Sequence, residues 1–183
     1  MPQPSMKQCA TAHHEAGHAL LAWQCRIRPG VSGVRIKSVS VIPGEGYEGR
    51  VEHRGLFQRC HRPDINMTLA TEARLMAGVD ICLAGHLAQR MFNARTCRRW
   101  QSRSDYHSAV DLAGYINNGN VPATEAFLKW REVCVQQVLQ GRWPLIEALA
   151  SELLKRQRLS EGELDRWMDS YFGVKPLSLN QQS

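Results

Sequence analysis

Residues 11–20 read TAHHEAGHAL and contain the pattern His14-Glu15-x-x-His18, from which the rest of the chain can be interpreted. Residues four apart on a helix lie nearly above one another, so the two imidazoles can bind one ion. Neutral imidazole binds zinc at about 2.0–2.1 Å, and a catalytic zinc also needs a third protein ligand and a water. Glu15 directly follows His14, where its carboxylate can take a proton from a water that the metal has acidified. The pattern therefore predicts a zinc-peptidase site.

The residues around this motif favour a helix. Ser5-x-x-Gln8 reads as a capping box, which places a helix start just upstream, and Pro29-Gly30 ends the helical pattern. The alternative interpretation is a helix that merely carries partly buried histidines. Three His within six positions beside a Glu argue against that alternative.

Length and composition indicate one intracellular domain. The 183 residues are expected to form a single domain over 1–173, followed by a flexible polar tail over 174–183. Lys and Arg outnumber Asp and Glu by 23 to 17, a net charge of +6 that does not by itself establish nucleic-acid binding. The six cysteines form no CxxC pair, which favours reduced thiols. With no secretory signal and no membrane-spanning run, we expect a soluble, cytoplasmic protein.

Two strands are predicted after the first helix. Residues 31–41 alternate apolar and polar side chains, Pro43 to Gly46 form a turn, and residues 47–53 read as a second strand. An exposed edge of this hairpin could pair with an extended peptide, with Gly46, Tyr47 and Gly49 as substrate-binding residues. The alternative is a structural hairpin whose edge is only solvated.

The remainder is predicted to be helical. Thr68 to Phe92 forms one long helical region, Ser104 caps a helix over Asp105–Asn117 that Asn118-Gly119 ends, and a helix covers Ala123–Gln140. Pro144 begins a helix that reaches about Arg158, and the capping box Ser160-x-x-Glu163 begins another that reaches about Tyr171. The fold class is therefore mainly α with a small β-sheet: a metal-binding helix, a short antiparallel hairpin and a C-terminal helical bundle.

The Ala123–Gln140 helix carries an apolar stripe. Its members recur at spacings of three and four and are predicted to face the core: Phe127, Trp130, Cys134 and Val138. Residues 95–103, with four arginines and one Trp, read as a solvated loop, although interleaved Arg and aromatic side chains can also bind nucleic acid. The chain has no glycine-rich phosphate loop, so we expect no ATP hydrolysis by these residues.

A third zinc ligand has to come from downstream. The candidates by residue type are Glu72, His86, Asp105, His107 and Asp111. Asp105 lies at a predicted helix start, where the helix dipole favours a carboxylate. Spacing alone does not separate Asp105 from His107 or Glu72.

Several segments resemble the peptidase domain of the FtsH-type AAA zinc metalloproteases. The segment TAHHEAGHAL is similar to that family's HEAGHA motif, and residues 38–50 (SVSVIPGEGYEGR) resemble its strand, Pro-turn and Gly-Tyr strand. Residues 84–89 (AGHLAQ) resemble its Gly-Gly-Arg-Ala-Ala-Glu helix, and Ser104-Asp105 resembles the segment whose aspartate completes the zinc site. The likeness extends over roughly residues 7–168 and is most specific in the zinc motif.

The resemblance implies a mainly helical metallopeptidase with zinc on His14, His18 and Asp105 and with Glu15 as the base. The ATPase and membrane segments of that family have no counterpart in these residues, so a hexameric ring and ATP-driven unfolding do not carry over. The family's glutamate in the Ala-Ala-Glu helix corresponds to Gln89, which is a poor zinc ligand. This difference favours Asp105 as the third ligand and calls into question a carboxylate that supports a histidine.

The sequence thus predicts a soluble, stand-alone zinc metalloendopeptidase that acts on unfolded or extended polypeptides bound along residues 47–51. A separate ATPase could supply those substrates, whereas we expect no nucleic-acid partner; the oligomeric state stays open. One alternative is a regulatory metallopeptidase with one dedicated protein substrate. Another is a non-catalytic binding module that contains zinc.

Overall fold

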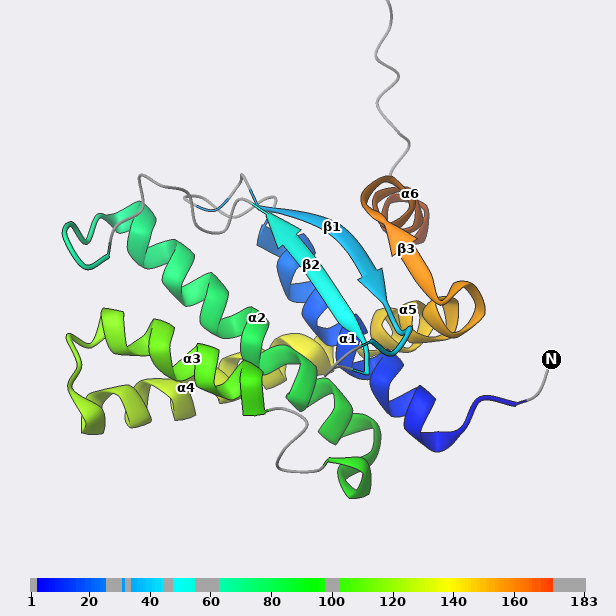
Figure 1. Ribbon diagram of the computed structural model, residues 1–183, viewed down its shortest axis with the longest axis horizontal. Coiled ribbons are helices and arrows are strands. Elements are labelled where there is room, and N and C mark those ends of the chain that lie inside the picture. Colours follow the sequence, from blue (N-terminus) through cyan, green and yellow to red (C-terminus); the bar gives the residue numbers. More distant parts are fainter. Residues whose placement is uncertain are drawn as a thin grey trace, which may run out of the picture.

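Six α-helices and a small sheet make up the described part of the chain (Figure 1). The structure, a computed structural model, describes residues 3–25, 31, 34–44, 48–54, 63–97 and 103–172. In chain order the elements are α1 (Met6–Gln24), β1 (Arg35–Ser40), β2 (Arg50–Arg54), α2 (Leu69–Asn93), the 3-10 helix η2 (Ala94–Thr96), α3 (Arg103–Ile116), α4 (Val121–Gly141), α5 (Trp143–Arg156), β3 (Arg158–Ser160) and α6 (Glu161–Tyr171). The predicted fold class, mainly α with a small sheet, is confirmed.

The sheet has three antiparallel strands in the order β2-β1-β3. The predicted hairpin forms β1 and β2, and β3 is an addition that the sequence did not predict. Val39 pairs with Val51 on one side and with Leu159 on the other, so these three side chains share the face that meets the core. Three residues are too few to display an alternating pattern, which explains why β3 was missed.

Helix α1 begins where the sequence predicted, at the capping box of Ser5. The Ser5 hydroxyl accepts from the Gln8 backbone N–H at 3.3 Å, and the Gln8 side chain accepts from the Ser5 N–H at 2.8 Å. The helix packs against α2 and α5 and lies beside β1 and β2 (Figure 1). Its run of alanines and Gly17 allows close approach, because a side chain at Gly17 would meet the Ala84 carbonyl of α2. The small residues thus allow α1 and α2 to pack closely against each other.

Helix α2 is continuous across Gly78 and Gly85. Thr68 caps it, with its hydroxyl accepting from the Thr71 N–H at 3.1 Å. Gly85 marks a close contact with α1, because a Cβ there would meet the rings of His14 and His18. Helix α2 contacts α1, α3 and α4, so it is the central support of the helical layer.

The predicted apolar stripe of α4 is only partly correct, since Phe127 and Val138 pack at the margin of the core but do not form the buried face. The buried residues are Thr124, Leu128, Arg131, Val135 and Leu139, whereas Trp130 is 53% exposed. Arg131 turns inward and donates two hydrogen bonds to the carboxylate of Asp80 on α2, at 2.8 and 2.7 Å. Arg131 thus lies on the same buried face of α4 as Leu128, Val135 and Leu139.

The ends of the last helices follow local chemistry. Helix α3 begins at Arg103, so Ser104 lies in its first turn and is not the predicted N-cap. Its end agrees with prediction, since Asn118 and Gly119 adopt left-handed φ values of 49° and 71°. Helix α5 ends at Arg156, before the predicted boundary, and the capping box of Ser160 and Glu163 begins α6 as predicted. In the described ranges, no helix combines the length and apolar character needed to cross a membrane.

Candidate metal centre

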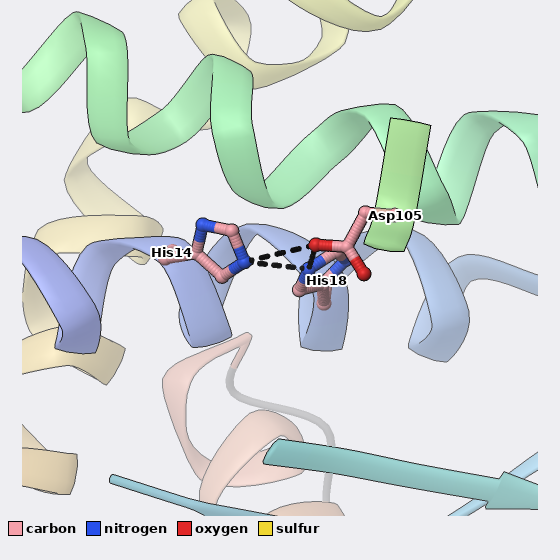
Figure 2. A group of neighbouring side chains, drawn as sticks. All are labelled: His14, His18 and Asp105. Carbon is pink, nitrogen blue, oxygen red and sulfur yellow. Dashed lines mark hydrogen bonds and ion pairs between the residues drawn. The ribbon is translucent and has the colours of Figure 1, made fainter. Parts of the chain in front are cut away.

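Three side chains from two helices converge on one point. His14 and His18 lie one turn apart on α1, and Asp105 comes from the first turn of α3 (Figure 2). The two Nε2 atoms are 3.0 Å apart, and Asp105 Oδ2 lies 3.3 Å from each of them. The structure thus brings together the three residues that the sequence and the resemblance assigned to the metal.

The triangle of atoms fits a zinc ion. A point equidistant from the three atoms lies about 1.9 Å from each, and a shift of under about 1 Å out of their plane reaches the zinc–ligand distance of about 2.0–2.1 Å. Two imidazoles and one carboxylate are also a donor set that zinc accepts, with a fourth position left open. Within the described residues this is the single group of three or more His, Cys, Asp or Glu side chains close enough to hold an ion.

Helix α2 holds both imidazoles by their other nitrogens. His18 Nδ1 donates to the backbone carbonyl of Ile81 at 2.6 Å, and His14 Nδ1 donates to Gln89 Oε1 at 3.2 Å. A proton on each Nδ1 leaves the lone pair on Nε2, which is the atom that faces the centre. Such contacts orient metal ligands in many proteins.

Gly85 lies between these two contacts. A Cβ on Gly85 would lie 2.7 Å from His14 Nε2 and 2.6 Å from His18 Cδ2, and His18 Nε2 would be nearer still. The imidazoles therefore occupy the space that a side chain at this position would fill. The glycine is needed here for close approach, because its own helix continues without a break.

The charges at the centre favour a cation. Burial alone would raise the pKa of Asp105, but its contacts with the His14 and His18 rings outweigh burial and hold this pKa well below its usual range. Burial would lower the pKa of His18, yet the Asp105 hydrogen bond and the nearby acidic charges raise it to about 9. The pKa of His14 is lowered, first by burial. Without metal, the proton on His18 therefore occupies part of the place that a metal cation would take.

Glu15 lies beside the centre in a buried position. Its side chain is only 4% exposed, and burial raises the pKa of its carboxyl to about 7. Gly49, just before β2, packs directly against it, since a Cβ there would lie 2.7 Å from both Cγ and Oε1 of Glu15. Of the predicted substrate-binding residues, Gly49 thus lies at the predicted base, while Gly46 and Tyr47 lie outside the described residues.

The other candidate ligands lie elsewhere. Glu72 is in the first turn of α2, about 20 Å along the helix axis from Gly85. His86 follows Gly85 but is not a member of the cluster, and burial lowers its pKa. His107 and Asp111 are on α3 and exposed. Of the five candidate ligands, Asp105 is thus the one that tertiary packing places beside His14 and His18.

His13, the third histidine of the motif region, has a structural position. Its Nδ1 donates to the Cys9 carbonyl at 2.8 Å, and its ring stacks on Phe92 and Trp143 with centroids 4.0 and 5.7 Å away. It therefore points away from the metal ligands, as expected from its position next to His14 on a helix.

Sequence reasoning missed the contribution of α2 to the site. The three positions that serve the imidazoles are four residues apart: Ile81, Gly85 and Gln89. That spacing is visible in the sequence, but nothing in it shows which face of α2 meets α1. Gln89 accepts a hydrogen bond from His14, so an amide supports this imidazole.

Comparison with known proteins gives one distant similarity. No protein-family model matches the chain. Over an alignment 195 positions long, the chain is 24% identical to the ATP-dependent zinc metalloprotease FTSH 9, chloroplastic/mitochondrial, of Oryza sativa subsp. japonica. The alignment covers 94% of this chain and 23% of the rice protein, so the chain spans about a quarter of the length of the curated relative that it matches. This similarity suggests a distant FtsH relationship across most of the chain.

Proposed function

We propose that this chain is a zinc-dependent metalloendopeptidase that hydrolyses peptide bonds in unfolded or extended polypeptides. The observation that carries the proposal is the triangle of His14 Nε2, His18 Nε2 and Asp105 Oδ2 beside a buried glutamate. The similarity to the rice protein, a zinc metalloprotease, supports the same reaction class.

The roles of the residues follow from their positions. His14, His18 and Asp105 would hold zinc, which when bound supplies a Lewis acid that acidifies water and polarises the scissile carbonyl. The Glu15 carboxylate accepts the proton of the attacking water and then delivers it to the leaving amine nitrogen. Burial raises the pKa of this carboxyl, to about 7 without metal, which moves it toward the range in which one group can both accept and release a proton near neutral pH.

The substrate would lie along the sheet edge nearest Glu15. Strand β2 is at one edge of the sheet, and its outer side pairs with no other described strand. Gly49, which contacts Glu15, directly precedes this strand. An extended peptide added to β2 by backbone hydrogen bonds would therefore pass beside the base.

The test separates metal binding from turnover. We expect one zinc per wild-type chain, with binding weakened by His14→Ala and by Asp105→Ala, while Asp111→Ala, an exposed aspartate on the same helix, leaves binding unchanged. Cleavage of an unfolded protein such as casein should be abolished by Glu15→Gln although zinc is retained. Zinc binding that survives Asp105→Ala would contradict the assigned ligand set.

The same assay addresses the alternatives. Cleavage confined to a single native protein would favour a regulatory peptidase with a dedicated substrate. Stoichiometric zinc with no cleavage of any peptide would refute the peptidase and favour a zinc-containing binding module.

A further inference from the structure

We propose that Gln89 is a positioning residue that sets the tautomer and ring orientation of His14 through a relay beginning at the backbone carbonyl of Thr96. This role rests on the proposed function in one respect, namely that His14 binds the metal through Nε2. It goes beyond that function because it explains how a neutral amide, where the resembling family has a glutamate, prepares the ligand.

The relay begins with the orientation of the Gln89 amide. Gln89 Nε2 donates to the carbonyl oxygen of Thr96 at 3.1 Å. A backbone carbonyl can only accept, so the amide nitrogen has to face Thr96 and the amide oxygen has to face the other way. The Gln89 side chain is 6% exposed, so water does not readily replace these partners.

The amide oxygen in turn selects the tautomer of His14. Gln89 Oε1 lies 3.2 Å from His14 Nδ1, and because this oxygen can only accept, the proton has to be on Nδ1. The Nε2 lone pair is then free to bind metal. In the opposite tautomer Nε2–H would donate to Asp105 Oδ2, 3.3 Å away, and would block the ligand position.

The two histidines are therefore oriented in different ways. His18 donates directly to a backbone carbonyl, that of Ile81, which no substitution of the Ile81 side chain removes. His14 reaches its backbone carbonyl only through the Gln89 side chain. The orientation of His14 thus depends on one replaceable residue, which makes the role testable.

A carboxylate at position 89 would keep one of the two Gln89 hydrogen bonds and remove the other. Glutamate could still accept from His14 Nδ1, but it has no N–H to donate to Thr96. Methionine, of similar length, can do neither. If Gln89 acts on His14, Gln89→Glu should preserve metal binding and Gln89→Met should not; if Gln89 only ties α2 to η2, both variants should behave alike.

The experiment compares the full-length chain with Gln89→Met, Gln89→Glu and the control Asn117→Leu. Asn117 also donates an amide N–H to a backbone carbonyl, that of Ala113 at 2.8 Å, but it lies about 18 Å along α3 from Asp105. Zinc affinity is measured by competition with a chelator. The tautomer of each histidine in the metal-free chain is read from nitrogen-15 ring chemical shifts.

We expect Gln89→Met to weaken zinc binding about 10- to 100-fold, the usual effect of removing a hydrogen-bond partner of a metal-binding histidine. His14 should lose its single tautomer in this variant, while the ring shifts of His18 should stay as in wild type. Gln89→Glu should stay within a few-fold of wild type, and Asn117→Leu should match wild type.

Unchanged zinc affinity or an unchanged His14 tautomer in Gln89→Met would overturn the proposal, and so would equal losses in the Met and Glu variants. Neither readout requires a substrate. A chain that binds zinc with the expected dependence on Gln89 but cleaves nothing would refute the proposed peptidase and leave the role of Gln89 intact.

Discussion

Replacing Gly85 with alanine should disrupt the metal centre with little effect on the fold. The added Cβ would lie 2.6 Å from His18 Cδ2 and 2.7 Å from His14 Nε2, whereas ordinary contacts begin at 3.4 Å. Both rings therefore have to retreat, by roughly 0.7 Å or more, which is several times the tolerance of about 0.2 Å for a metal–ligand distance. Retreat of His18 also breaks its 2.6 Å hydrogen bond to Ile81. We expect zinc affinity to fall by about 100-fold or more.

The stability of the metal-free Gly85→Ala chain should change much less. Crowding in a packed core costs about 1–3 kcal/mol, and the better helix propensity of alanine returns up to about 1 kcal/mol. The matched control is Gly114→Ala on α3, where an added Cβ would have no atom within 4 Å. This control should keep wild-type zinc affinity and gain up to about 1 kcal/mol of stability.

The assay is chelator competition for zinc affinity together with urea unfolding of the metal-free chains. If Gly85→Ala bound zinc as tightly as wild type, the imidazoles could not occupy the space next to Gly85, and the derived geometry would be refuted. A chain that failed to fold would instead show that the glycine is required for the packing of α1 on α2.

Three further predictions concern the buried charges. Zinc affinity should rise about tenfold per pH unit between about pH 6 and 8, because the pKa of His18 is about 9 without metal and zinc displaces that proton; a flat profile in chelator titrations would contradict this. In the metal-free chain, folding raises the pKa of the Glu15 carboxyl from 4.5 to about 7, so the folded state binds its proton more tightly than the unfolded state does. The free energy of unfolding of wild type should therefore fall by about 2–3 kcal/mol as pH rises through that window. Glu15→Gln should abolish this fall in urea unfolding. Asp80→Ala should lower the free energy of unfolding by about 3–5 kcal/mol, because it leaves the Arg131 guanidinium buried without its carboxylate. Adding Arg131→Met should recover part of this loss. Equal stability of the single and double variants in urea unfolding would count against the ion pair.

Local signals explain most of what could be predicted about the helices. The capping boxes at Ser5 and Ser160 predicted two helix starts, and Asn118-Gly119 predicted one helix end. These signals depend on residues within one turn of each other, so they can be recognised in the amino-acid sequence alone. Strand β3 and the burial of Arg131 on α4 were missed, because pairing with β1 and the Asp80–Arg131 ion pair both join residues far apart in the chain.

For the proposed metal centre, the sequence by itself placed two candidate ligands and the candidate base. His14, Glu15 and His18 belong to one helix, and helix geometry sets their relative positions regardless of what packs around them. The third ligand was a choice among five candidates, from which the resemblance favoured Asp105. Only the tertiary structure brings Asp105 to within 3.3 Å of both imidazoles, because α3 has to pack on α2 with its first turn at the site.

The tertiary structure alone also decided what surrounds those ligands. Gly85 and Gln89 contact the imidazoles only because one face of α2 lies against α1. Gly49 contacts Glu15 only because the segment before β2 packs over that side chain. Hydrogen bonds and close contacts across elements depend on positions in space that no spacing in the sequence encodes. A helix can thus carry its own metal motif, while the partners that orient the motif are chosen by packing.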